Sequence, residues 1–212
     1  MRRIVLILLS LICWSVSSLH ASGDDERTIL KVFGCIDLLS SGNASKAILS
    51  AKTSTSVSLK GGLGGGIQVL VPFNNNVSVG GEFGFIFTSF EQKTSAFYDN
   101  QKTTASHYIG FSPLIAYLNY RFSRIYIQGG IGLSIYRTFI TYDNVSPDLQ
   151  SITNSEVKTG GCTVIGAGFM MPFLGFIGLD FSVKYYSTFV SINGKTNNDA
   201  LLMPTVGVLF QF

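Results

Sequence analysis

Residues 163–186 read TVIGAGFMMPFLGFIGLDFSVKYY, and this stretch distinguishes two ways of crossing a membrane. Its first seventeen residues carry no charge, as in a transmembrane helix. Pro172 would break such a helix, because proline lacks an amide donor and its ring clashes with the preceding turn. From Ile177 onward, bulky apolar residues alternate with Gly, Asp, Ser and Lys, which is the period of a two-faced strand. We therefore predict two strands joined by a tight turn at residues 172–175.

The same hairpin unit recurs along the chain. Alternating segments flank the three asparagines at residues 74–76 and the turn at residues 121–124, and further strands lie near residues 29–39 and at residues 201–212. Long polar segments without an apolar period separate the hairpins: residues 40–56, 91–106, 141–158 and 191–199. The pattern predicts eight strands, three tight turns and four long loops. Strands of about 10 to 14 residues cross a bilayer when they are tilted.

The composition agrees with strands in a membrane. Only 13% of residues are charged and the mean hydropathy is +0.36, whereas soluble domains carry about 25% charged residues. The chain has 23 Gly, 17 Phe and 9 Tyr, unlike a helical membrane protein, where Leu and Ala would dominate. The net charge is only +3 and the basic residues are scattered, which argues against a nucleic-acid partner.

The richer apolar face continues from strand to strand, so we expect it to point outward into lipid. A sheet in hydrocarbon must close on itself, because no backbone group can stay unpaired there. We predict an all-β fold: an eight-stranded antiparallel transmembrane β-barrel with a filled or narrow interior, short periplasmic turns and four long external loops. A soluble lipocalin-like carrier, with its apolar face inside, is the alternative. Aromatic residues near strand ends would form an interfacial girdle: Phe73, Tyr120, Phe122, Phe173, Phe176, Phe210 and Phe212.

In the fourth and sixth strands the alternation does not decide which side chains face the lumen, because both sets of alternate positions mix apolar and small residues. In the fourth strand, for example, Phe111 and Ile115 stand against Leu114 and Leu118.

The N-terminus has the pattern of a secretory signal peptide. Two arginines precede a short apolar run and small residues, and the charged sequence DDER follows. We predict a signal peptide over residues 1–23 and a barrel domain over residues 24–212. Cleavage leaves Cys35 and Cys162, which fall on strands that are not neighbours, so we expect two free thiols.

A few charges fall on the polar faces of the strands. Glu82, Asp180 and Lys184 lie on the third and seventh strands. A charge inside a barrel must pair or meet water, because an isolated buried ion is costly. We predict a lumen charge network of Glu82, Asp180, Lys184, Lys31 and Asp37. Plugging the barrel is its favoured role, ahead of a gate or an ion path.

Two features weakly suggest chemistry. His107 follows Ser106 near a strand start, but a nucleophile also needs an orienting group. The glycine run at residues 61–66 precedes a strand, whereas a phosphate-binding loop precedes a helix. We expect no catalytic residues, no cofactor and no metal, and we expect that the chain is not an enzyme.

The signal peptide, the eight amphipathic strands and the ending Phe210-Gln211-Phe212 resemble small outer-membrane β-barrel proteins of Gram-negative bacteria. The segment SPLIAYLNYRFSRIYIQGGIGLSIY (residues 112–136) is similar to the central hairpin of the outer-membrane β-barrel domain family. The resemblance implies location in the outer membrane and an assembly signal at Phe210 and Phe212.

The partners implied are outer-membrane lipid, the barrel-assembly machinery and periplasmic chaperones, with a monomeric barrel. No catalytic residue is shared across the family. The expected function is a structural scaffold that displays surface loops for adhesion or partner binding. A narrow passive channel is the alternative, and a lipid-modifying enzyme ranks lowest.

Overall fold

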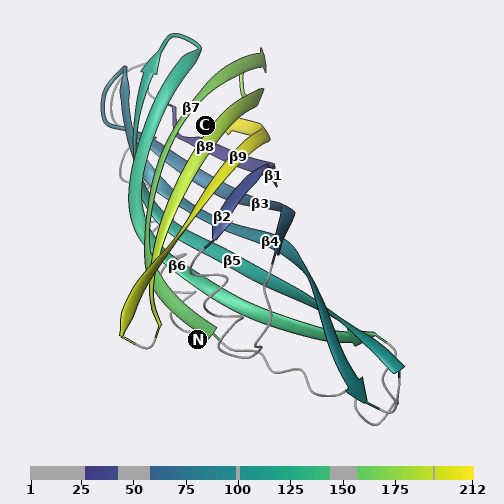
Figure 1. Ribbon diagram of the computed structural model, residues 1–212. Coiled ribbons are helices and arrows are strands. Elements are labelled where there is room, and N and C mark those ends of the chain that lie inside the picture. Colours follow the sequence, from purple (N-terminus) through teal and green to yellow (C-terminus); the bar gives the residue numbers. More distant parts are fainter. Residues whose placement is uncertain (1–26, 43–57, 99–100, 144–156, 193) are drawn as a thin grey trace, which may run out of the picture.

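The computed structural model describes residues 27–42, 58–98, 101–143, 157–192 and 194–212, which form β-strands and short connections (Figure 1). The predicted signal peptide lies outside these ranges. In the part of the chain described, no helix is long and apolar enough to cross a membrane. The strands are β1 (Ile29–Asp37), β2 (Leu39–Gly42), β3 (Ser58–Pro72), β4 (Val77–Tyr98), β5 (Gln101–Phe122), β6 (Ile125–Asp143), β7 (Val157–Leu174), β8 (Ile177–Ile192) and β9 (Lys195–Gln211).

The sheet closes into a ring. From β3 to β9 each strand pairs antiparallel with the next, and β1 pairs with both β3 and β9. The short β2 continues β1, because Leu38 N donates to Leu202 O at 3.1 Å and β2 also pairs with β9. The ring is therefore an eight-stranded antiparallel barrel whose first strand is interrupted at Leu38, and the predicted fold class is confirmed.

The register around the ring fixes how far the strands tilt. Lys31 of β1 pairs directly with Leu209 of β9. Following the ladder pairings the other way, from Lys31 through β3 to β8, ends at Asp199, ten residues from Leu209. An offset of ten residues in eight strands corresponds to a tilt of about 40° and an interior that side chains can fill.

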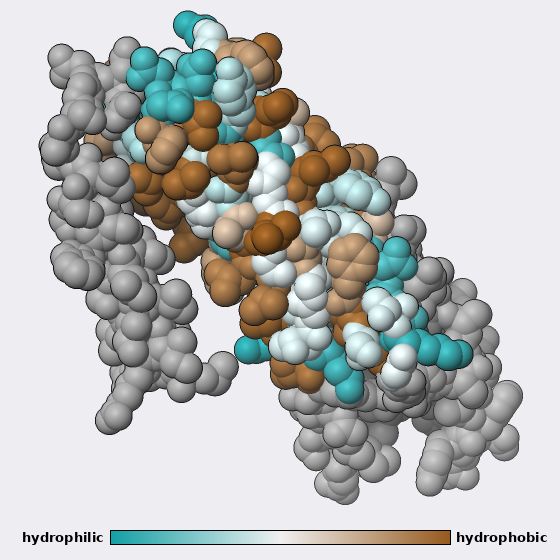
Figure 2. Space-filling view, turned by 90° about the vertical axis from the view of Figure 1, so that its left-hand side faces the viewer, coloured by the Kyte–Doolittle hydropathy of each residue, from teal (hydrophilic) through white to brown (hydrophobic). Residues whose placement is uncertain are grey.

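The two faces of each strand differ as the alternation predicts. Along β8, Asp180, Ser182 and Lys184 are buried inside, whereas Phe181 and Val183 are exposed on the outer wall. The space-filling view shows hydrophobic residues over the middle of the wall and hydrophilic residues toward both ends (Figure 2). This distribution fits a barrel whose outer surface meets hydrocarbon.

In β5 and β7, where the sequence alone does not decide the direction of the side chains, the structure defines which of them point inward. In β5, Phe111 and Ile115 point into the barrel while Leu114 and Leu118 point outward. In β7, Cys162 and Val164 are buried inside, and Ile165 is exposed. The inner face therefore carries large apolar side chains as well as polar ones, because a barrel of this size must be filled.

The short turns and both termini of the barrel lie at one end. Thr28 and Phe212 exchange backbone hydrogen bonds of 3.1 and 3.0 Å. The turn at residues 74–76 lies where we predicted it, as does the one at residues 121–124, where Ser123 adopts φ 56°. The third turn is shifted, because β7 runs through Pro172 to Leu174. A register irregularity between these two residues accommodates the proline.

Two of the predicted long loops are wrong. Residues 91–106 belong largely to a hairpin in which β4 runs to Tyr98 and β5 starts at Gln101; it extends to the lower right of Figure 1. Residues 191–199 are also a tight hairpin, with Gly194 at φ 76°. Outside the bilayer both faces of a ribbon meet water, so strands there need no apolar period. The expected strand length of about 10 to 14 residues is therefore too short for β4 and β5, each of 22 residues.

The other two predicted loops are shortened by strands. β6 continues to Asp143 and β7 begins at Val157, inside the predicted loop 141–158. β2 occupies the start of the predicted loop 40–56. The remainders of both segments lie outside the described residues.

Candidate functional site in the barrel lumen

Four charged side chains of the predicted network lie close together inside the barrel, on three strands. Lys31 comes from β1, Glu82 from β4, and Asp180 and Lys184 from β8; each exposes 3% or less of its surface. They point inward because each occupies the same parity as its strand's other buried residues. The structure brings these four residues together as two ion pairs, Lys31–Asp180 and Lys184–Glu82.

The first ion pair is the centre of a cluster near the short-turn end, which is at the top of Figure 1. We take the short-turn end as the bottom of the barrel and call these residues the lower cluster: Lys31, Asp180, Tyr126 and Ser182. Tyr126 Oη donates to Asp180 Oδ1 at 2.7 Å, and Ser182 Oγ donates to Asp180 Oδ2 at 3.1 Å. Lys31 Nζ also donates to Tyr126 Oη at 3.1 Å and to Ser182 Oγ at 3.2 Å. The lower cluster therefore connects β1, β6 and β8.

The second ion pair forms the upper cluster: Glu82, Lys184 and Tyr186. Lys184 Nζ donates to Glu82 Oε2, and Tyr186 Oη donates to Glu82 Oε1, so both carboxylate oxygens have partners. The Lys184 ammonium also lies 4.0 Å from the centroid of the Phe33 ring, where a cation is attracted to the π face. Such satisfaction is what a buried ion pair requires, because removal from water is costly for both ions.

Asp37 lies on the same inward face of β1, beyond Lys31 and toward the long-hairpin end, and it is buried. The two ion pairs are formed by the other four residues of the predicted network.

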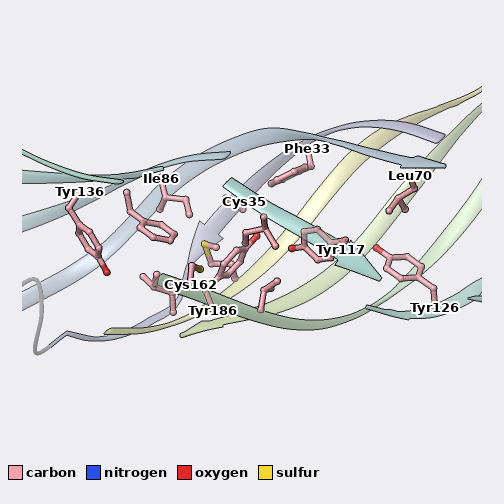
Figure 3. Packing of buried hydrophobic residues seen from close by; sticks show 14 of the residues in the cluster. Phe33, Cys35, Leu70, Ile86, Tyr117, Tyr126, Tyr136, Cys162 and Tyr186 are labelled. Atoms are coloured by element: carbon pink, nitrogen blue, oxygen red, sulfur yellow. The ribbon is translucent and has the colours of Figure 1, made fainter. Parts of the chain in front are cut away.

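Tyrosines contribute more to the lumen than the sequence analysis assigned to them. Figure 3 shows Tyr126, Tyr117, Tyr186 and Tyr136 distributed along the barrel with their hydroxyl groups inside. Tyr136 Oη contacts Thr188 Oγ1 and donates to Asp199 Oδ2 at 3.4 Å. The available signal was parity, because these tyrosines share the faces of the predicted polar residues. Large amphipathic rings at inward positions fill volume and supply hydrogen bonds at once.

Apolar side chains pack beside the upper cluster and beyond it toward the long-hairpin end. Phe33, Cys35, Ile86 and Cys162 are buried together in the close-up of the core (Figure 3). Both cysteines are free thiols, as predicted. Gly66 makes room for this packing, because a Cβ there would lie 2.8 Å from the Phe33 ring.

Several polar atoms in the lumen lack a protein partner within the described residues. Gln68 Nε2 donates to Gln128 Oε1 at 3.0 Å, which leaves Gln68 Oε1, Gln128 Nε2 and the Tyr117 hydroxyl without one. Buried groups of this kind are usually satisfied by ordered water. The lumen thus suits a polar, side-chain-filled core that holds isolated waters.

The structure places the weaker chemical candidates within strands. Ser106 and His107 lie within β5 opposite Glu91 and Phe90, and their side chains are outside the described set. The glycine run at residues 61–66 lies within β3, a strand. Among the described side chains, no three His, Cys, Asp or Glu residues come together as a metal site would require.

The predicted assembly residues lie at the short-turn end. Phe210 pairs with Leu30 on one side and with Ile177 on the other. Phe212 exposes 66% of its surface, and its backbone is held by Thr28.

Comparisons with solved structures find the same fold. Ail, the attachment invasion locus protein of Yersinia pestis, has a TM-score of 0.52 at 15% identity, and the match covers 88% of this chain and 99% of that one. The outer membrane protein OprG from Pseudomonas aeruginosa has a TM-score of 0.50 at 10% identity, covering 90% and 98%. At these identities the likeness concerns the fold alone.

Sequence comparison supplies the family. No curated protein matches the chain. The model of the outer membrane protein beta-barrel domain matches residues 8–212, nearly the whole sequence. A closed eight-stranded ring with an apolar outer wall and a polar, filled lumen is the architecture of such barrels. The chain belongs to the outer membrane protein beta-barrel domain family and is a β-barrel of the outer membrane.

Proposed function

We propose that this protein is a non-enzymatic, non-conducting outer-membrane scaffold whose external hairpins bind a partner surface. The observation that carries the proposal is the ion pair between Lys184 and Glu82. In the ring order β1-β3-β4-β5-β6-β7-β8-β9, β4 and β8 stand opposite each other, so this pair spans the barrel's diameter. A wide aqueous path cannot pass where side chains from opposite walls touch.

The lower cluster obstructs the lumen at a second level. Tyr126 of β6 and Lys31 of β1 also come from opposite strands, and their polar atoms lie 3.1 Å apart. Met203, the ladder partner of Lys184 on β9, and Val190, further along β8 toward the long-hairpin end, are also fully buried. Conduction would require several satisfied contacts to open together, each at a cost in desolvated polar groups.

The external end supports a display role. The last described pair of the β3–β4 ladder is Ser58 with Glu91, and the β4–β5 ladder continues to Tyr98 and Gln101. Seven further residues at about 3.3 Å each carry the β4–β5 ribbon about 20 Å beyond Glu91. Binding residues are commonly presented by segments that project from a rigid frame.

We propose adhesion as the display function, with a test on whole cells. Bacteria carrying the full chain are compared with bacteria whose residues 93–104 are replaced by a two-residue Asn-Gly turn, which joins the ladder partners Gln92 and Ala105 and closes a hairpin without the ribbon. We expect attachment to epithelial monolayers to fall while the amount of folded barrel stays the same. Equal attachment by both strains would contradict the proposal that this hairpin mediates adhesion.

Planar-bilayer recording tests the closed barrel. We expect no discrete openings from the refolded wild-type protein. Openings that Glu82→Ala alters would contradict the scaffold proposal and support a narrow passive channel instead. The channel is the second candidate because Gln68 Oε1 and Gln128 Nε2, inside the lumen, have no protein partner among the described residues.

Assembly partners complete the proposal. We propose that the barrel-assembly machinery reads Phe210 and Phe212 and that periplasmic chaperones carry the unfolded chain. The exposure of Phe212 at a strand end supports this role, because its ring is accessible to a partner instead of packed inside the barrel.

A further inference from the structure

The outer wall of the barrel is hollowed between β5 and β6. A groove of about 600 Å³ lies there, a size that is within the range of small-molecule sites, about 300–1,000 Å³. Its outward-facing lining comprises Ala116, Leu118 and Tyr120 from β5 and Ile127, Gly129 and Ile131 from β6. The groove is apolar and opens on the lipid-facing side of the wall.

The groove exists because small residues interrupt a row of large ones. On the ladder, Ala116 pairs with Ile131 and Gly129 pairs with Leu118, so each small residue lies beside a bulky one. Leu118 and Ile131 stand out from the wall, with exposed fractions of 58% and 71%.

Gly129 is not required by the packing of the barrel. A Cβ there would have Val164 O as its nearest neighbour, at an ordinary 3.8 Å. By contrast, a Cβ on the adjacent, inward-facing Gly130 would lie 2.6 Å from Ala116 O. The space over Gly129 is therefore outside the fold and available to another molecule.

Charge at the end of the groove indicates which molecule. The β5–β6 turn lies four residues beyond Gly129, about 13 Å along the strand. This turn carries Arg121 and Arg124, and residues 72–78, 119–126 and 172–178 contain no Asp or Glu. Arg124 lies in the turn itself and is exposed. Arg121 has the inward parity of Tyr117 and Asn119, and its Nη2 donates to Asn75 O of the β3–β4 turn at 3.4 Å, so its guanidinium adds positive charge at the rim on the side of β5 away from β6.

We propose that this groove binds an anionic glycerophospholipid of the periplasmic leaflet. One acyl chain lies over Ala116 and Gly129 between Leu118 and Ile131, and the phosphate lies near Arg124, with Arg121 adding positive charge at the rim. Arginine is well suited to phosphate, because its planar fork gives paired, charge-assisted hydrogen bonds. Tyr120 lies between the two parts of the site, at the depth where aromatic rings meet head groups.

A second copy of the chain fits the groove less well. Two barrels inserted in the same direction would place their β5–β6 turns on the same side of the membrane. An interface at this groove would then bring two pairs of arginines close together with no acidic residue in the turns to offset them.

Native mass spectrometry of the whole mature barrel tests the proposal. The protein is reconstituted in vesicles of equal phosphatidylglycerol and phosphatidylcholine and then extracted in mild detergent. The variants are Gly129→Leu, which fills the groove, and Arg121→Gln with Arg124→Gln, which removes the head-group charges. The control is Gly161→Leu, on β7 outside the groove, because a Cβ on Gly161 has nothing within 4 Å. Heat-modifiable gel migration verifies that each variant is folded.

We expect the wild type and Gly161→Leu to retain one phosphatidylglycerol, and Gly129→Leu to retain about tenfold less. The double arginine variant, altered only at the rim, is expected to lose its preference for phosphatidylglycerol over phosphatidylcholine. Wild-type retention in Gly129→Leu would overturn the site. The assignment of the occupant would be overturned if the arginine variant kept the wild-type preference for phosphatidylglycerol over phosphatidylcholine. It would also be overturned if the wild type were a dimer and Gly129→Leu were a monomer.

Discussion

Lys184 of β8 and Glu82 of β4 meet across the full diameter of the barrel, and the Tyr186 hydroxyl donates a hydrogen bond to the second oxygen of the Glu82 carboxylate. The contact joins strands that are far from each other along the sheet. Because backbone ladders connect only neighbouring strands, the interior pair adds a cross-link that the ladders cannot supply.

Removing one partner of this pair should destabilise the barrel strongly. Glu82→Leu or Lys184→Met alone leaves a buried charge without its partner, and we expect a loss of about 3–5 kcal/mol in the free energy of unfolding. Urea unfolding of the refolded protein in lipid vesicles measures it. The double variant Glu82→Leu with Lys184→Met should recover most of the loss, because an apolar pair can replace buried ions. Additive losses in the double variant would show that the two side chains are not coupled.

The Tyr126 hydroxyl should contribute measurably to the lower cluster. It donates to Asp180 Oδ1 at 2.7 Å and accepts from Lys31 Nζ. In Tyr126→Phe both contacts are lost, and we expect a destabilisation of about 1.5–3 kcal/mol, the range for hydrogen bonds to charged groups. Tyr120→Phe is the matched control, since Tyr120 lies on the outer wall. The same unfolding measurement should leave this control near the wild type; equal losses in both variants would contradict the role of the cluster.

Gly66 should tolerate no side chain. A Cβ there would lie 2.8 Å from both the Gly84 Cα and the Phe33 ring, so Gly66→Ala must push β4 or Phe33 away. We expect a loss of about 1–3 kcal/mol, as for other overpacked cores. Gly161→Ala, at an open position, should be nearly neutral. Slower refolding and a lower urea midpoint for Gly66→Ala alone would bear this out, and equal midpoints would contradict it.

The transmembrane part of the fold could be predicted because lipid imposes a simple pattern. In β8, apolar Phe181 and Val183 alternate with Asp180 and Lys184, and the burial of these residues follows the same alternation. The inward facing of the charges follows from that pattern alone. Which charges pair does not, because Lys31–Asp180 depends on the shear of the closed ring, a property of the whole barrel.

The external part could not be predicted in the same way. The polar segment that includes Ser106 and Gln92 was expected to be a loop, but it continues the β4–β5 ladder. A ribbon in water is stabilised by its cross-strand hydrogen bonds, and neither face is selected to be apolar. Its sequence therefore lacks the period from which strands are recognised. The tyrosine contacts in the lumen were missed for another reason, since parity places a ring inside but does not identify its partner.

The terminal Phe212 should matter for assembly more than for stability. It exposes 66% of its surface, while its backbone hydrogen bonds to Thr28 do not depend on the ring. We expect Phe212→Ala to reduce the amount of heat-modifiable barrel in the outer membrane of expressing cells. Refolding of the purified variant into vesicles should keep a wild-type yield, because few packing contacts are lost. Phe173→Ala, another exposed aromatic residue at the same end, is the control and should assemble normally. If Phe212→Ala fails equally in cells and in vesicles, the residue serves folding itself; if it assembles normally in cells, the machinery does not read it.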